Sequence, residues 1–247
     1  MTLPLAKFSI SKEHELWGGI SLYQLYEEAM TPWHWHKELF DHANEVGMDA
    51  FSSPFDHSAV DFLEQLNCPI YKIASMETGD VDLIAYAASK GKRMIISTGA
   101  STLAEIEQAV LAAQNVREQL TLLVCTSAYP ADAKDAHIKR IMTLREKFKL
   151  NVGLSDHTLG VGVSVAAIAL GATVIEKHIT INRSDGGHDA AFSLEPDEFK
   201  FLVDEGNKAH LALGCADWKI QDSESESRRL RRSLYITKPV SKGEVQR

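Results

Sequence analysis

The chain has 247 residues, of which 45% are hydrophobic and 24% are charged, and its formal net charge at pH 7 is −8. These values suit one large globular domain, such as an α/β barrel, and argue against a nucleic-acid-binding protein, which normally carries a basic face. Its cysteines, Cys68, Cys125 and Cys215, form neither a zinc pattern nor a disulfide framework, and reduced thiols favour a cytoplasmic protein. No apolar run approaches the roughly 18 residues of a membrane span, and residues 1–20 lack the pattern of a signal peptide.

Two helices are predicted before the first strand, over residues 20–29 and 32–46. Thr31 suits the N-cap of the second helix and Pro32 its first turn, and Gly47 is expected to end it. The histidines of this helix are His34, His36 and His42. We expect them to be surface residues around a tryptophan anchor, because no carboxylate lies at a spacing that would complete a metal site.

From residue 48 onward, apolar runs rich in β-branched residues alternate with helical patterns. The predicted strands cover residues 48–55, 70–74, 93–96, 120–125, 151–154 and 171–178. The predicted helices between and after them cover residues 59–66, 83–90, 102–115, 138–148, 161–170 and 196–213. Strict alternation of this kind indicates a parallel sheet with right-handed crossovers.

Polar residues follow every predicted strand. In a barrel the carboxyl ends of all strands meet at one face, whereas an open doubly wound sheet gathers its ligand at one switch point. Polar residues at all six strand ends therefore favour an α/β fold of the (β/α)8 TIM type. Such a barrel has eight strands, and residues 1–30 contain no good strand, so we expect a barrel that lacks the first two.

Two histidines, His157 and His178, end consecutive predicted strands. Neighbouring parallel strands lie about 5 Å apart, so two side chains at matching depth could share one ion. Each histidine lies beside a carboxylate, Asp156 or Glu176, and imidazole suits transition metals better than Ca or Mg. A metal site is favoured over the alternative that each is a hydrogen-bonded core histidine.

A second cluster of strand-end residues resembles an anion site. Lys72 lies in one predicted strand and Ser75 follows it, and Ser97, Thr98 and Gly99 follow the next strand. Lysine supplies a positive charge, the hydroxyls donate hydrogen bonds, and glycine permits close backbone approach. A Schiff-base role for Lys72 or Lys177 is the alternative, but it would need no metal, so the paired histidines count against it.

Three other features are weaker. Tyr129 and Pro130 form an aromatic corner that could bind a ligand or pack over the barrel rim, and both interpretations stay open. Asp189, in a glycine-rich loop, could accept hydrogen bonds from sugar hydroxyls, although an ordinary loop aspartate is the simpler interpretation. The basic run 228–232 follows an acidic run and is interpreted as a solvated connector.

Taken together, these strand ends resemble the N-acetylneuraminate (sialic acid) synthase family. The resemblance is carried by six segments in order, residues 51–56, 71–75, 97–99, 125–130, 153–157 and 175–178. Within the family, residues 22–26, 31–33 and 189–196 are most similar to pseudaminic acid synthases. Members of the family are metal-dependent barrels that condense phosphoenolpyruvate with an N-acetylated hexose in its open, aldehyde form.

The resemblance implies roles for individual residues. It implies that His157 and His178 bind a divalent metal, usually Mn²⁺. It implies that the phosphate and carboxylate of phosphoenolpyruvate are held by Lys72, Ser75, Ser97, Ser127 and Ser155, with Ser53 close by. Many relatives have Asn where Ser127 stands. The residues implied to lie near the sugar and the metal-bound water are Glu77, Tyr129, Glu176 and Asp189, with Glu176 or Glu77 orienting the water and Lys72 beside the reacting enol.

Two differences from the family concern the ends of the chain. Relatives begin with two further strands, so residues 1–222 are expected to form an N-terminally incomplete barrel. Relatives end with an antifreeze-like (SAF) domain, and residues 223–247 are expected to be a linker and the start of that domain only. In relatives an arginine of this domain reaches the partner subunit's site, which implies a homodimer.

The sequence thus predicts a transferase that makes pseudaminic acid from phosphoenolpyruvate and a 2,4-diacetamido-2,4,6-trideoxy-altrose, with release of phosphate. One alternative is a synthase for N-acetylneuraminic or legionaminic acid. A second alternative is a shortened, non-catalytic chain that binds sugar phosphates. No nucleic-acid or membrane partner is expected.

Overall fold

The computed structural model describes residues 9–10 and 18–245. The chain divides into two units, Met1–Leu213 and Gly214–Arg247. The first unit contains the strands, and the second contains a short helix, α9 (Ser225–Arg229). Whether residues 223–247 begin a further domain stays a prediction from the sequence.

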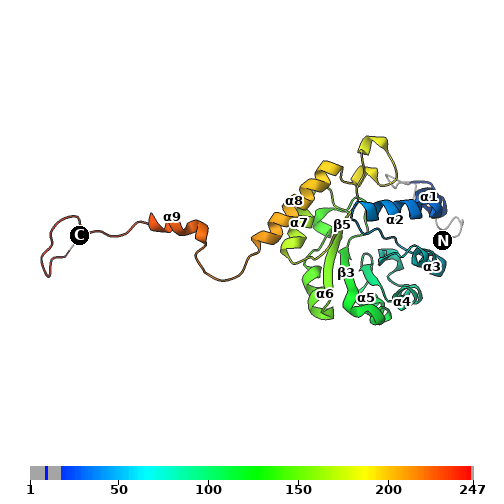
Figure 1. The fold of residues 1–247 in the computed structure, drawn as a ribbon, viewed down its shortest axis with the longest axis horizontal. Helices are drawn as coiled ribbons and strands as arrows, with labels where there is room; N and C mark the ends of the chain where they lie inside the picture. The colour runs from blue at the N-terminus through cyan, green and yellow to red at the C-terminus, as the bar shows by residue number, and fades with distance from the viewer. Residues whose placement is uncertain (1–8, 11–17, 246–247) are drawn as a thin grey trace. The chain divides into compact units, whose positions relative to one another are not determined.

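The first unit is built on a parallel sheet in the order β1-β2-β3-β4-β5. The strands are β1 (Ile70–Ile73), β2 (Arg93–Ser97), β3 (Leu120–Cys125), β4 (Asn151–Asp156) and β5 (Ile175–Lys177). Consecutive strands are neighbours throughout, and helices follow one another around the outside of the sheet (Figure 1). The expected parallel α/β architecture of an incomplete barrel is confirmed.

The predicted strand over residues 48–55 is wrong. This segment contributes one parallel bridge, between Ser52 and Tyr71 of β1. Pro54 has no backbone N–H to donate, and the bridge joins the segment to the sheet on one side only. Residues 1–8 and 11–17 lie outside the described residues. The described residues Ser9 and Ser21 form an isolated antiparallel bridge.

The helices of the first unit confirm the predicted alternation. They are α1 (Leu22–Ala29), α2 (His36–Glu45), α3 (His57–Gln65), α4 (Val81–Ser89), α5 (Leu103–Ala112), α6 (Arg140–Phe148), α7 (Gly162–Ala169) and α8 (Pro196–Ala212). Local sequence explains their starts: Thr102 and Glu105 form a capping box at α5, and Pro196 occupies the first turn of α8. Among the described helices, none has both the length and the apolar character needed to cross a bilayer.

The predicted helix over residues 32–46 is divided into a short 3-10 helix, η2 (Trp33–Trp35), and α2. His36 is buried, which corrects the expectation of a surface residue. Its Nδ1 atom lies 3.2 Å from the carbonyl oxygen of Pro32, and its ring meets Phe62 edge-on. The stacking of Trp33 on Phe62 agrees with a tryptophan anchor.

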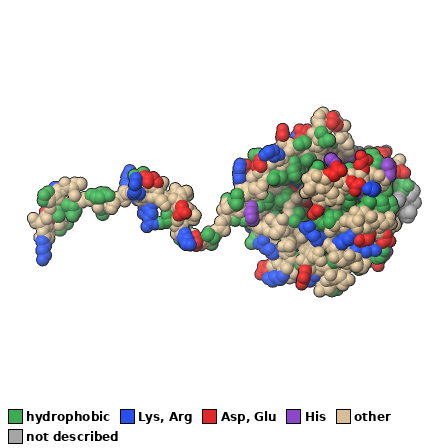
Figure 2. All heavy atoms as spheres, in the orientation of Figure 1, with side chains coloured by type: hydrophobic (Ala, Val, Ile, Leu, Met, Phe, Trp, Pro, Cys, Tyr) green, Lys and Arg blue, Asp and Glu red, His purple; other side chains and the backbone are tan. Residues whose placement is uncertain are grey.

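The two faces of the sheet differ in chemistry. Side chains that face the helices, such as Tyr71, Ile96 and Leu122, belong to one large apolar core. On the inner face Ile70, Ile95 and Leu123 form a separate, much smaller apolar cluster with Val174. Charged side chains of both signs are interspersed over the surface in Figure 2. The residues that follow the inner cluster along each strand are polar, so the interior changes from apolar to polar toward the strand ends.

Gly153 of β4 is expected to be intolerant of a side chain. A Cβ atom there would lie 2.2 Å from the carbonyl oxygen of Val174, which accepts a hydrogen bond from Leu154. Gly153→Ala should therefore push the β5 segment away and lower the free energy of unfolding by about 1–3 kcal/mol in a urea titration. Gly79→Ala is the matched control, since a Cβ there meets no atom within 4 Å. Equal unfolding midpoints for the two variants would contradict this account of the sheet.

Candidate active site

Polar side chains from four strands meet inside the carboxyl end of the sheet. The Nζ atom of Lys72 on β1 donates a 2.8 Å hydrogen bond to Ser97 on β2 and lies 3.6 Å from Glu176 on β5. The other oxygen of Glu176 accepts a 2.7 Å hydrogen bond from Ser155 on β4. The Lys72 side chain is only 8% exposed, so its charge depends on these partners. The structure therefore brings together four of the residues that the sequence placed in one site.

The hydroxyls of Ser75 and Ser127 both lie close to Gly99. The amide of Gly99 donates a 3.0 Å hydrogen bond to Ser75 Oγ. A Cβ atom on Gly99 would lie 2.7 Å from that oxygen and 2.2 Å from Ser127 Oγ. Any residue larger than glycine at position 99 would therefore displace these two hydroxyls from their positions beside the Lys72 cluster.

The two strand-end histidines face each other. The ring centroids of His157 and His178 are 5.3 Å apart. The Nδ1 atom of His157 lies 2.9 Å from the carbonyl oxygen of Thr126, which can only accept, so Nδ1 donates this hydrogen bond, and in the neutral imidazole Nε2 keeps its lone pair. The Nδ1 atom of His178 lies 3.4 Å from a carboxylate oxygen of Asp189.

Aromatic rings cover one side of the histidine pair. The ring of Tyr129 lies 4.2 Å from His157, and Phe192 lies 5.0 Å from His178 and 5.4 Å from Tyr129, all measured between centroids. Burial raises the pKa of Tyr129 to about 12, aided by the Cys125 thiol and nearby carboxylates. Tyr129 therefore keeps its phenolic proton at neutral pH and can donate it in a hydrogen bond.

Glu77 lies in the short 3-10 helix η3 (Ser75–Glu77), directly after β1. Burial raises the pKa of this carboxyl group, and the positive charge of Lys72 offsets part of the effect. Its Oε2 atom is buried and has no hydrogen-bond partner among the described residues. A buried acceptor without a partner is costly, so this oxygen is suited to accept a hydrogen bond from a ligand.

Two residues of the same motifs lie on the opposite face of the sheet. The Nζ atom of Lys177 lies 2.9 Å from Asp156 Oδ2, and both side chains are 1% exposed. Asp156 also accepts a hydrogen bond from Ser164 on α7, which covers the helix side of the sheet. This placement argues against Lys177 as a Schiff-base residue and separates Asp156 from the histidine site.

Ser53 remains the least defined of the predicted residues. It follows Ser52, whose backbone bridges to β1, and it is partly buried.

Sequence reasoning missed Cys125 and Phe192 in this site. Cys125 Sγ lies 3.8 Å from Ser127 Oγ, and its position at the end of a predicted strand was the available signal. Phe192 lies beyond the last strand, in the short 3-10 helix η7 (Ala190–Phe192), where no periodic pattern marks it.

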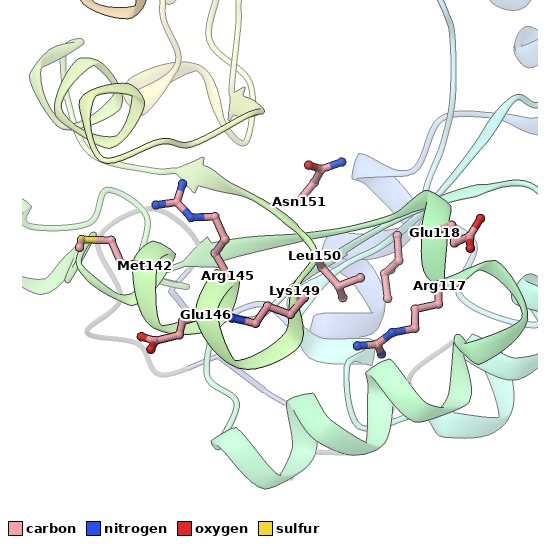
Figure 3. Close-up of a pocket in the computed structure, with 9 residues that line it drawn as sticks. Arg117, Glu118, Met142, Arg145, Glu146, Lys149, Leu150 and Asn151 are labelled. Atoms are coloured by element: carbon pink, nitrogen blue, oxygen red, sulfur yellow. The ribbon is translucent and has the colours of Figure 1, made fainter. Parts of the chain in front are cut away.

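A separate pocket lies away from these residues (Figure 3). This hollow of about 630 Å³ is lined by the first residues of β3 and β4, Leu120 and Asn151, and therefore lies at the amino end of the sheet. Two of its cations already have backbone partners: Arg117 donates to Phe148, and Arg145 donates to Leu170 and Gly171. Because these carbonyls lie at the ends of α6 and α7, the arginines stabilise helix termini.

Comparisons with known proteins agree on one family. The model of the NeuB family matches residues 3–217 of the chain. Pseudaminic acid synthase of Helicobacter pylori is 43% identical over 232 residues, which are 93% of this chain and 68% of that protein. N,N'-diacetyllegionaminic acid synthase of Campylobacter jejuni is 41% identical over 214 residues, which are 85% of this chain and 64% of that protein.

A solved structure supports the same relationship. The N-acetylneuraminic acid (sialic acid) synthetase of Leptospira borgpetersenii, determined in complex with citrate, superposes with a TM-score of 0.78 at 33% identity. The match covers 85% of this chain and 74% of that structure.

The raised pKa of Glu77 predicts a pH-dependent effect of Glu77→Gln. Because the folded state binds this proton more tightly than the unfolded state, the stability from Glu77 is fully present below its usual pKa and is lost as pH rises through the folded pKa. The variant should melt at a higher temperature than the wild type at pH 8, and the difference should disappear toward pH 4. Glu27→Gln, at an exposed position on α1, controls for the loss of one surface charge. A difference that is constant from pH 4 to 8 would contradict the assignment.

Proposed function

The chain belongs to the NeuB family, and we propose that it is a sugar-acid synthase that condenses phosphoenolpyruvate with an N-acetylated amino-hexose to form pseudaminic acid. One observation carries this proposal: a buried lysine with a group of serine hydroxyls lies next to two facing histidines. The first group suits a small dianion, and the second suits an ion that polarises a carbonyl.

Phosphoenolpyruvate is proposed to occupy the space bounded by Lys72 and Gly99. Lys72 supplies a positive charge, and hydroxyls are available from Ser75, Ser97 and Ser127. Glu176 and Ser155 already pair on the β5 side of this space. An anion bound here would be held by donors whose positions the Lys72 and Gly99 hydrogen bonds already fix.

The acceptor sugar is proposed to lie against the aromatic side of the site. Tyr129 and Phe192 present apolar rings, while Glu77 offers a buried oxygen that needs a donor. Asp189 lies within 3.4 Å of His178 and is half-exposed, so it can reach a sugar hydroxyl from the outer side. This combination of apolar surface and a few polar groups is typical of small-molecule sites.

A divalent metal, Mn²⁺ in our proposal, fits the two histidines. Their Nδ1 atoms face a carbonyl and a carboxylate, which is the outer-sphere arrangement common for metal-binding histidines and leaves both Nε2 atoms available. Within residues 9–10 and 18–245, no group of three or more His, Cys, Asp or Glu side chains is placed to hold an ion. His157 and His178 would therefore share the ion with water or substrate, as in catalytic sites. When bound, such an ion supplies Lewis-acid polarisation of the aldehyde oxygen.

The proposed reaction forms one carbon–carbon bond. The enol carbon of phosphoenolpyruvate attacks the aldehyde carbon, and the resulting cationic centre takes up water. Phosphate then leaves by C–O cleavage. Glu176 can orient the water and accept its proton, because Ser155 and Lys72 hold both carboxylate oxygens in place. Lys72 can offset the negative charge of the departing phosphate.

The identity of the sugar can be tested directly. Purified chain is incubated with phosphoenolpyruvate, Mn²⁺ and, separately, 2,4-diacetamido-2,4,6-trideoxy-altrose, N-acetylmannosamine or the legionaminic acid precursor, and phosphate and product mass are measured. We expect turnover with the altrose derivative. Turnover only with the legionaminic precursor would instead favour the activity named for the Campylobacter relative. Phosphate release at background with all three sugars would favour a non-catalytic, sugar-phosphate-binding chain.

The homodimer and the cytoplasmic location stay predictions.

The metal assignment predicts the effect of single substitutions. His157→Ala and His178→Ala should each lower Mn²⁺ affinity at least about tenfold in a calorimetric titration, because each removes one of two nitrogen ligands. His34→Ala, at an exposed position in η2, should leave the titration unchanged. Wild-type affinity in both site variants would contradict the assignment.

A further inference from the structure

Strand β5 is weakly held by the sheet alone. It contains three residues, pairs with β4 through three register positions, and is the last strand in the sheet order. Each of its residues is only partly buried as a whole, unlike the residues of β1, although the side chain of Lys177 is itself buried. Two residues of the proposed site, Glu176 and His178, nevertheless come from this segment. Their positions therefore need support beyond backbone hydrogen bonds.

Side chains supply that support on alternate faces of the two strands. Ser155 and Glu176 are register partners and are bonded on the inner face. Asp156 and Lys177, the next register partners, are bonded on the helix side. The following pair, His157 and His178, faces the interior again. The Asp156–Lys177 pair thus lies directly between the two contacts that form the site.

Asp156 also fixes the turn that contains His157. Its Oδ1 atom accepts hydrogen bonds of 2.9 and 2.7 Å from the amide and hydroxyl of Thr158, on the far side of His157. Lys177 donates to the carbonyl oxygen of Thr158 as well as to Asp156. Strand β5 is therefore tied to both neighbours of His157 in the sequence.

We propose that Asp156 and Lys177 are positioning residues, which hold His157 and His178 at their facing separation from the helix side of the sheet. A buried ion pair is often no more stabilising than an apolar pair of the same size, so stability alone does not explain these charges. A fixed connection between β4 and β5 does explain why these charges are present. The inference rests on the proposed function only in its use of the two histidines as ligands.

The test uses the double variant Asp156→Asn/Lys177→Met. It leaves no unpaired buried charge and keeps side-chain volume, so it should fold and melt near the wild-type temperature. The readout is the imidazole N–H proton of His157, which is bonded to Thr126 and is observed by NMR in histidine-labelled, ligand-free protein. Comparison with His157→Gln assigns the signal. We expect exchange of this proton with water to be at least tenfold faster in the double variant.

Val152→Ala is the matched control. Val152 lies on the same strand, is fully buried among the helix-side core residues, and is distant from the strand end. This variant should lower the melting temperature and leave the exchange rate unchanged. Exchange within twofold of wild type in the double variant would overturn the proposal, as would an equal increase in Val152→Ala.

A second measurement separates this inference from the proposed function. Mn²⁺ and phosphoenolpyruvate are titrated into the wild type and the double variant at a temperature where both are folded. We expect affinity for Mn²⁺ to fall at least tenfold in the double variant. A wild type that binds neither ligand would refute the proposed function, and the exchange measurement would still decide the positioning role. Equal Mn²⁺ affinity in the two proteins would overturn the positioning role alone.

Discussion

The site depends on how the protein keeps the charge of Lys72 inside the sheet. An unpaired ammonium group there would cost several kcal/mol, and an ion pair repays that cost only when its geometry is good. Ser97 and Glu176 provide those partners from two other strands, and Ser155 fixes Glu176 from a fourth. The strands must therefore be in register for the lysine to be tolerated. The same contacts leave the cation facing a space where an anion can bind.

Alternation of side chains along the strands separates this chemistry from the core. In β4 and β5, residues of one parity face the interior and belong to the site, while Asp156 and Lys177 face the helices. The large core on the helix side is almost entirely apolar. Most of the folding free energy from burial must therefore come from the outer layer, since the inner apolar cluster is small. The interior can then hold polar groups that would otherwise destabilise the protein.

Much of this arrangement could be predicted from the sequence because it follows from periodicity and strand ends. The alternation of strands and helices identified the parallel sheet, and the positions of His157 and His178 at consecutive strand ends predicted their proximity. The prediction of a strand over residues 48–55 was wrong because Pro54 has no backbone N–H to extend the pairing beyond the single bridge at Ser52. Alternation also places Lys177 on the helix side, because it lies between Glu176 and His178, which the sequence assigned to the site.

The loops were the least predictable part of the site. The aromatic contact of Phe192 with His178 joins residues 14 positions apart through an irregular segment, and no sequence period reports such a return of the chain. Glu77 is a similar case, because its burial depends on which side of a short 3-10 helix faces the interior. Strand ends fix where chemistry can occur, whereas loops fix what else reaches it.

The two ends of the sheet also differ in electrostatic character, and this difference favours the proposed substrates. In a parallel α/β unit the helix C-termini lie near the amino ends of the strands, where their partial negative charge accumulates. Arg117 and Arg145 donate to carbonyl groups at the ends of α6 and α7, so the cations at that end stabilise helices rather than bind ligands. At the opposite end the helix N-termini contribute partial positive charge. Lys72 adds a full charge there, which Glu176 partly offsets, so the hydrogen-bond donors and partial positive charge suited to a dianionic substrate lie at the end of the sheet that holds the two histidines.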